Sequence, residues 1–138
     1  MFLDLNEEQN LIRETAREFS EAALAPVAAA LDRGEEQNVF LDNLKKLAEL
    51  GFMGLNVKAD YGGSEAGVIA FSVALTEIAR ACASTAVTVS VNNMVCEVIQ
   101  AVGSEEQRQC YIPKICSGEY PAGAFALTET GAGSDPAS

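Results

Sequence analysis

The spacing of apolar and polar positions predicts helices along most of the chain. The first begins at "NEEQ", where Asn6 is suited to cap a helix and Gln9, three positions later, can bond back to it. Apolar and small residues then recur at helical spacing opposite a charged face: Leu11, Ile12, Thr15, Ala16 and Phe19. Pro26 should interrupt this helix, because its ring removes a donor and crowds the preceding turn. The Ala-rich stretch to Leu31 then forms a second piece.

A further helix is predicted from about Leu41 to Leu50, with Gly51 placed to end it. The next segment, "GFMGLNVKADYGGSEAG", has five glycines in seventeen residues and cannot sustain a helix. We expect a loop that packs through its apolar side chains, Phe52, Met53, Leu55 and Val57.

Two long apolar helices follow, from Val68 to about Ala83 and from there to Gly103. Both are apolar in almost every turn, which predicts burial on nearly all sides. In the second, valines at 87, 89 and 91 alternate as in a strand. The run is too long for a strand and continues with helical spacing to Val102, so the pattern favours a helix.

The last helix opens with the capping box "SEEQ", Ser104 to Gln107, and should end near Pro113. After "SGEYP", the run "AGAFAL" is the first strand-like signal, and we predict a short buried strand from Ala124 to Thr128. The predicted fold class is all-α. Residues 1–120 form a module of five or six helices, and residues 121–138 supply a terminal strand and loop that would begin a β-domain.

Composition narrows the function. The 138 residues suffice for one core, and the formal charge of -11 argues against nucleic acid and anionic membranes as partners. The chain has no apolar run of membrane-spanning length, and "MFLDLNEEQN" lacks signal-peptide features, so we predict a cytoplasmic protein.

The cysteines and the missing histidine restrict the chemistry further. Four cysteines without C-x-x-C spacing are interpreted as reduced thiols, with a disulfide as the less favoured alternative. The absence of histidine removes Ser-His and Cys-His nucleophiles and most zinc sites, so no metal site is predicted. Catalysis would need a carboxylate or a cofactor.

The terminal loop "GAGSD" fits neither common phosphate-binding motif. Pro136 follows where a Rossmann fingerprint needs a helix, and no G-K-[ST] is present for a P-loop. Taken alone, the loop is either a ligand site or a solvent-exposed turn.

Three motifs taken together are more specific than the terminal loop alone. They are "LAELGFMGLNVKADYGGSEAG", "GSEEQRQCYIPKICSGEYPAG" and "FALTETGAGSD". In this order they resemble the N-terminal part of the acyl-CoA dehydrogenase family of flavoproteins, from about Asn6 to Asp135. The resemblance implies a helical domain, a middle β-domain and a C-terminal bundle, with FAD between the last two. It also implies α,β-dehydrogenation of an acyl-CoA thioester, an electron-transfer flavoprotein as electron acceptor, and a homotetramer.

The same resemblance implies the cofactor-binding residues of this chain. They are Phe125, Ala126, Leu127, Thr128, Glu129, Gly131, Ala132, Gly133 and Ser134. Thr128 would bond the polar edge of the flavin, Gly131 to Ser134 would approach its pyrophosphate, and Ser134 would also contact the acyl-CoA. Thr130 stands where the family usually has proline, which weakens the rigidity of the loop.

Two other segments match family features. The helix at 87–102 resembles the one that borders the acyl-tail pocket, so Ser90, Asn92, Asn93 and Met94 are candidates for tuning chain length, with ordinary core packing as the alternative. Tyr61, Gly62 and Gly63 match a family signature that a structural turn also explains.

No catalytic residue is assigned, because the family's glutamate base lies beyond Ser138 by this resemblance. We therefore expect the fragment alone neither to hold FAD tightly nor to be active. Two alternatives stay open. One is a free-standing, non-catalytic helical interaction module, and the other is a flavin monooxygenase or nitroalkane oxidase relative.

Overall fold

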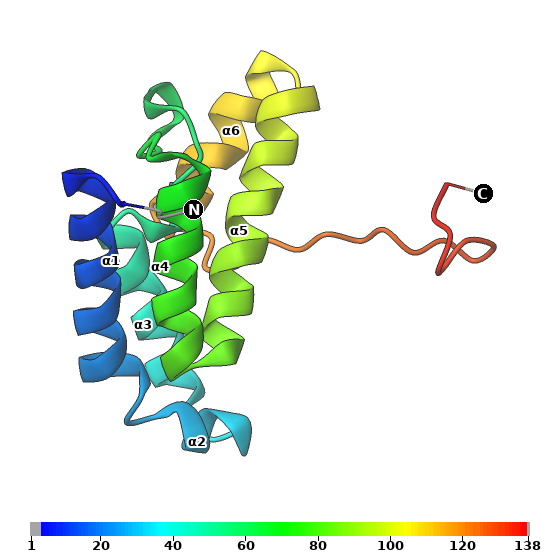
Figure 1. Cartoon of the computed structure of the whole chain (residues 1–138). Coiled ribbons are helices and arrows are strands. Elements are labelled where there is room, and N and C mark those ends of the chain that lie inside the picture. Colours follow the sequence, from blue (N-terminus) through cyan, green and yellow to red (C-terminus); the bar gives the residue numbers. More distant parts are fainter. Residues whose placement is uncertain (1–3, 138) are drawn as a thin grey trace.

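The computed structural model describes residues 4–137, and helices account for most of them (Figure 1). Met1–Leu3 and Ser138, which belong to the predicted ranges 1–120 and 121–138, lie outside the described residues. The elements are α1 (Glu7–Phe19), a π-helical turn (Ser20–Leu24), α2 (Ala28–Asp32), α3 (Gln37–Glu49), 3₁₀ turns at Phe52–Gly54 and Ala59–Tyr61, α4 (Gly67–Ala81), α5 (Ala83–Val102) and α6 (Glu105–Cys116). With six α-helices in the described part of the chain, the all-α prediction is confirmed.

Both predicted capping boxes are present. The Asn6 side chain accepts from the Gln9 amide at 2.8 Å, and the Gln9 side chain accepts from the Asn6 amide at 3.1 Å. The same reciprocal pair joins Ser104 and Gln107 at the start of α6. Each box satisfies two backbone donors that the first turn of a helix leaves unpaired, which fixes where α1 and α6 begin.

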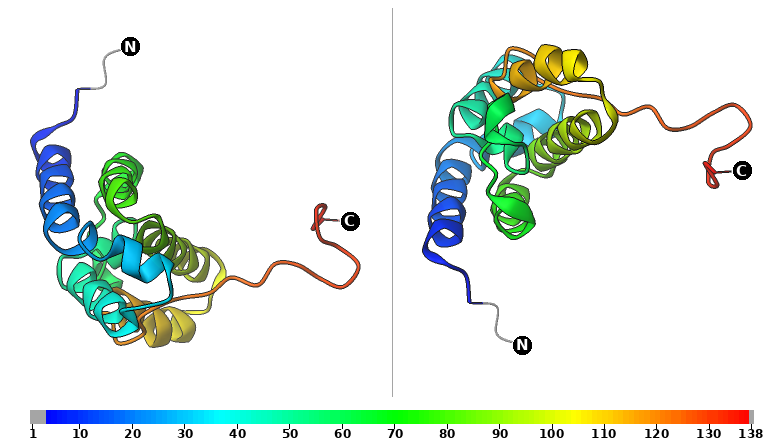
Figure 2. Two further views of the ribbon diagram at one scale, coloured as in Figure 1. Left: turned by 90° about the horizontal axis from the view of Figure 1, so that it is seen from below. Right: turned by 90° about the horizontal axis from the view of Figure 1, so that it is seen from above.

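The main core lies where α4 packs against α1 and α5 (Figures 1 and 2). Its largest fully buried side chains come from several elements and include Leu24, Leu44, Leu47, Phe52, Met53, Ile78 and Val89. A second cluster joins Val57 and Tyr61 to Cys96, Ile112, Ile115 and Cys116. The glycine-rich segment therefore contributes to both clusters, and its predicted packing through Phe52, Met53, Leu55 and Val57 is confirmed.

The two helix ends predicted at prolines differ in whether the structure confirms them. The interruption at Pro26 is confirmed, because it lies in the turn between the π-helical segment and α2. The predicted end of the last helix near Pro113 is wrong, since α6 continues through it to Cys116. The extra turn buries Ile115 and Cys116 in the second cluster, which offsets the hydrogen bond that proline cannot donate.

The prediction that α4 and α5 are buried on nearly all sides is also wrong. Val68 is 67% exposed and Val87 is 62% exposed, and Val102 is still more open. One face of each helix packs into the core, while several apolar side chains on the other face are not covered by any described residue. Exposed apolar side chains gathered on one face are typical of a surface that another domain or protein covers.

The four cysteines are free thiols, as predicted. Cys82, Cys96 and Cys116 are buried, and Cys110 is exposed. A hydrogen bond with Cys116 and burial both raise the pKa of the Cys96 thiol, so Cys96 stays protonated at neutral pH. It therefore packs as a small apolar side chain.

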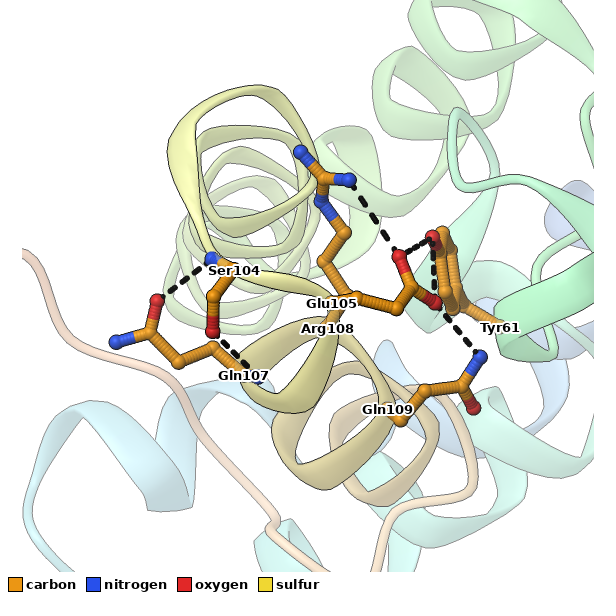
Figure 3. Close-up of polar contacts among 6 residues, drawn as sticks. All are labelled: Tyr61, Ser104, Glu105, Gln107, Arg108 and Gln109. Atoms are coloured by element: carbon orange, nitrogen blue, oxygen red, sulfur yellow. Dashed lines mark hydrogen bonds and ion pairs between the residues drawn. The ribbon is translucent and has the colours of Figure 1, made fainter.

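A polar cluster ties the glycine-rich segment to the start of α6 (Figure 3). The Tyr61 hydroxyl donates to the Glu105 carboxylate at 3.0 and 3.3 Å, and Gln109 donates to the same carboxylate at 3.1 Å. Burial, followed by the bond to Glu105, raises the pKa of Tyr61. The bonds from Gln109 and Tyr61 lower the pKa of Glu105. Tyr61 thus has a structural role, in agreement with the interpretation of Tyr61, Gly62 and Gly63 as a structural turn.

This cluster predicts a pH-dependent contribution to stability. Because the pKa of Glu105 is lower in the fold, its carboxylate stabilises the fold above the unfolded pKa, and the contribution is lost as pH falls through the folded pKa. Glu105→Gln should therefore melt at a lower temperature than wild type at about pH 7, with the gap closing at about pH 3. Thermal denaturation followed by circular dichroism checks this. A gap of equal size at both pH values would contradict it.

No helix in residues 4–137 combines the length and the apolar character needed to cross a bilayer.

Candidate functional site

After α6, the chain leaves the helical bundle as an extended segment that projects well beyond it (Figures 1 and 2). Residues 121–137 contain neither a helix nor a strand among the described residues. The predicted buried strand from Ala124 to Thr128 is therefore wrong for this structure. Phe125 and Leu127 are 47% and 55% exposed. A strand needs a neighbour for its backbone groups, and no other described segment runs alongside this one.

The segment folds back on itself once, in a tight turn. The Glu129 amide donates to the Ala132 carbonyl at 3.1 Å, and the Ala132 amide donates to the Glu129 carbonyl at 3.2 Å. Thr130 and Gly131 form the corner of this turn, and Ala132 is its one buried side chain. The turn holds its shape without a proline at position 130.

Gly131 in the turn and Gly133 just after it are not required by contacts among the described residues. A side-chain Cβ added at Gly131 or Gly133 would meet no atom within 4 Å, and neither residue has a positive φ. Gly63 is the opposite case, because a Cβ there would overlap the Val57 backbone. The open space around Gly131 and Gly133 is what a backbone that must approach a ligand closely would need.

The structure places the predicted cofactor-binding residues on this one exposed segment. The turn brings Glu129, Gly131 and Ala132 together, whereas Phe125, Ala126, Leu127 and Thr128 lie along the extended part before it and Gly133 and Ser134 follow it. Except for Ala132, all of these residues are exposed.

A stripe on α5 forms the second half of the candidate site. Val87, Ser90, Val91 and Met94 are spaced by three and four residues and so share one face of the helix, which we call the α5 stripe. Members of the stripe line three grooves, of about 520, 320 and 380 Å³. The buried face of α5 carries Ala86, Val89 and Cys96.

One of these grooves joins the α5 stripe to the terminal segment. It has a volume of about 380 Å³ and is lined by Val87, Thr88, Val91, Met94 and residues 122–125. None of these lining residues is charged. The groove thus offers an apolar surface that ends at Phe125, immediately before the segment that carries the turn.

The sequence identified only part of this groove. Met94 lines it, and Ser90 lines the two neighbouring grooves. Asn92 and Asn93 are almost fully buried and do not line it, although Asn93 lines the neighbouring groove of about 520 Å³. Val87, Thr88 and Val91 were missed. The spacing of the α5 stripe would have revealed them, but the same spacing also fits a core face and does not show which face stays open.

Comparison with known proteins identifies the family. The family described as "Acyl-CoA dehydrogenase, N-terminal domain" matches residues 6–119. The chain belongs to the acyl-CoA dehydrogenase family. A short-chain specific acyl-CoA dehydrogenase of Clostridium acetobutylicum is 36% identical over 136 residues, which cover 98% of this chain and 35% of that protein. The chain thus spans about a third of the length of this relative.

Solved structures agree with the family assignment. A chain in a structure of the electron transferring flavoprotein of Acidaminococcus fermentans, which concerns flavin-based electron bifurcation, matches with a TM-score of 0.86 and 33% identity, covering 99% of this chain and 35% of that one. An acyl-CoA dehydrogenase complexed with FAD from Bacillus anthracis matches with a TM-score of 0.85 and 29% identity, covering 96% and 22%.

Proposed function

We propose that this chain is the N-terminal domain of a flavin-dependent acyl-CoA dehydrogenase that oxidises a short-chain acyl-CoA thioester between its α and β carbons. In this proposal, residues 1–120 form the helical domain and residues 121–138 begin the β-domain. The family assignment supports the reaction class, and the similarity to a short-chain specific relative supports the size of the acyl group.

The residues present fit FAD. The segment from Phe125 to Ser134 is exposed, and the space around Gly131 and Gly133 admits close approach of the backbone to a large anionic ligand. Thr128 would bond the polar edge of the flavin, and residues 131–134 would contact the pyrophosphate. FAD, when bound, supplies the two-electron acceptor for the oxidation. The structure with FAD from Bacillus anthracis supports this cofactor.

The groove beside α5 is our candidate for the acyl tail. Its lining is uncharged and largely apolar, as a hydrocarbon chain requires, and it leads toward the segment assigned to the flavin. The chain would contribute Val87, Val91 and Met94 to the wall of the tail site and Ser134 to the contact with the thioester end. We assign the catalytic base to none of its residues.

We propose an electron-transfer flavoprotein as the electron acceptor of the complete enzyme. The match to a chain in a structure of such a flavoprotein supports this assignment. The complete enzyme would be a homotetramer, in keeping with the family resemblance. The open apolar faces of α4 and α5 favour a domain that is covered in a larger protein over a free-standing module.

One observation carries the proposal: the apolar groove and the open glycine-bearing turn lie on the same short segment, with the groove ending at Phe125 and the turn beginning at Glu129. The experiment is a chimera in which this chain replaces the matching N-terminal part of the Clostridium acetobutylicum relative. The purified chimera should contain FAD and oxidise butyryl-CoA. The isolated chain should do neither, and the unmodified relative is the control.

Two results would contradict the proposal. The first is a chimera that has the expected helical circular dichroism but neither FAD nor activity. The second is an isolated chain that retains stoichiometric FAD and oxidises acyl-CoA, which would overturn the assignment of the missing chemistry to other domains.

A further inference from the structure

Two adjacent asparagines lie in the middle of α5, where a helix of this composition would be expected to bury apolar side chains. Asn92 is 0% exposed and Asn93 is 1% exposed. Burying a carboxamide is costly unless its donor and acceptor atoms are bonded. Each of these side chains is satisfied by a different backbone segment outside the helix, so each connects α5 to another part of the chain.

Asn93 holds the glycine-rich segment. Its oxygen accepts from the Leu55 amide at 2.8 Å, and its nitrogen donates to the Phe52 carbonyl at 2.9 Å. The nitrogen also donates to the Val89 carbonyl within α5. These partners all belong to the helical domain, so the bonds of Asn93 order that domain and do not reach the terminal segment.

Asn92 holds the point where the chain leaves the helical domain. Its oxygen accepts from the Gly123 amide, and its nitrogen donates to the Pro121 carbonyl at 3.4 Å and contacts the Met53 sulfur at 3.1 Å. The fit is close, because a Cβ at Gly123 would lie 3.3 Å from both the Asn92 oxygen and the Val95 Cβ. Asparagine suits this position since it offers an acceptor and a donor side by side.

The anchored residues lie directly before the candidate site. Gly123 is two residues before Phe125, where the proposed flavin-binding segment begins, and it also lines the groove proposed for the acyl tail. Beyond Gly123 the described chain is exposed as far as the turn. The bond from Gly123 to Asn92 therefore ties the helical domain to the start of the segment proposed to lead to the flavin.

We propose that Asn92 is a positioning residue that fixes the flavin-binding segment relative to the acyl groove. It acts through the backbone of Pro121 and Gly123 and contacts neither ligand. The inference rests on the proposed function, because it assigns a purpose to an anchor that would otherwise only order the end of the domain. A displacement of about 1 Å between reacting groups can cost a hundredfold in rate, so such an anchor has a functional consequence.

The first test uses the 138-residue chain and reports on the anchor alone. Asn92→Ala should accelerate hydrogen exchange of the Gly123 amide by about tenfold or more, while the amide of Cys96 in α5 changes little. Asn93→Ala is the matched control, since it removes a neighbouring, equally buried carboxamide but leaves the bond to Gly123. Equal Gly123 exchange in wild type and Asn92→Ala, measured by nuclear magnetic resonance, would overturn the anchor.

The second test uses the chimera and reports on function. Asn92→Ala should weaken FAD binding by about tenfold and lower kcat for butyryl-CoA, whereas Asn93→Ala should lower the melting temperature with FAD binding within about threefold of wild type. If Asn92→Ala does not fold, Asn92→Asp replaces it. This variant keeps an oxygen that accepts from the Gly123 amide but loses the donor to the Pro121 carbonyl, so a loss of FAD affinity smaller than tenfold is expected.

The outcomes separate the two proposals. Equal losses of FAD affinity in the Asn92 and Asn93 variants would show that Asn92 acts only through stability and would overturn the positioning role. A wild-type chimera that folds without FAD would instead overturn the proposed function, and the positioning role with it, while the exchange of Gly123 would still report whether the anchor exists.

Discussion

Gly63→Ala is expected to lower the free energy of unfolding of the helical domain by about 3 kcal/mol. The added Cβ would overlap the carbonyl group of Val57, which is backbone in the same packed segment and has no room to move. Nearby bonds from Gly63 to Lys58 and from Glu65 to Val57 would also be strained. Chemical denaturation of the 138-residue chain, followed by far-ultraviolet circular dichroism, measures the effect.

Gly131→Ala provides the matched control for this prediction. It makes the same chemical change at a position where the Cβ meets no atom, so the free energy of unfolding should stay within about 0.5 kcal/mol of wild type. If both variants lost stability equally, the cost would come from glycine replacement in general and not from the contact with Val57.

The second large effect is expected in FAD binding. In the chimera, Gly133→Val should weaken FAD binding by about a hundredfold, because a branched side chain would hold the backbone away from the pyrophosphate. The same substitution should leave the stability of the isolated chain unchanged, since no described atom lies near that position. Fluorescence titration of the apo-chimera with FAD provides the measurement.

A control on the same segment sharpens this prediction. Thr130→Pro introduces, at the corner of the turn, the proline that the family resemblance implies for this position, and it should leave FAD binding equal to wild type or tighter. Unchanged FAD affinity in Gly133→Val would contradict the proposed contact of residues 131–134 with the pyrophosphate.

Local signals in the sequence were sufficient for most of the helical domain. Asn6 with Gln9 and Ser104 with Gln107 form the predicted capping boxes, because a capping box is complete within four residues. The alternating valines of α5 were correctly assigned to a helix, because the length of the run outweighed the alternation.

The errors arose where the answer depends on distant groups. The strand expected at Ala124–Thr128 needs a neighbour that no described residue supplies, and Pro113 remains inside α6 because the turn after it buries Ile115 and Cys116. The open face of α5 has the same cause, since periodicity shows that a face is apolar and not what covers it. In the candidate site, family resemblance indicated the segment from Phe125 to Ser134, but the link from Asn92 to Gly123 became visible only in three dimensions.

Among the described residues, neither core cluster contains a residue beyond Cys116, so the core of the helical domain lies entirely before the proposed ligand-binding segment. This arrangement bears on how such a protein evolves. Substitutions between Ala124 and Ser134 should change ligand binding at little cost in fold stability, whereas substitutions at Pro121, Gly123 or Asn92 should change both ligand binding and stability. Selection on the residues after Gly123 should therefore act through ligand binding and not through the stability of the fold, and changes at the anchor should occur together.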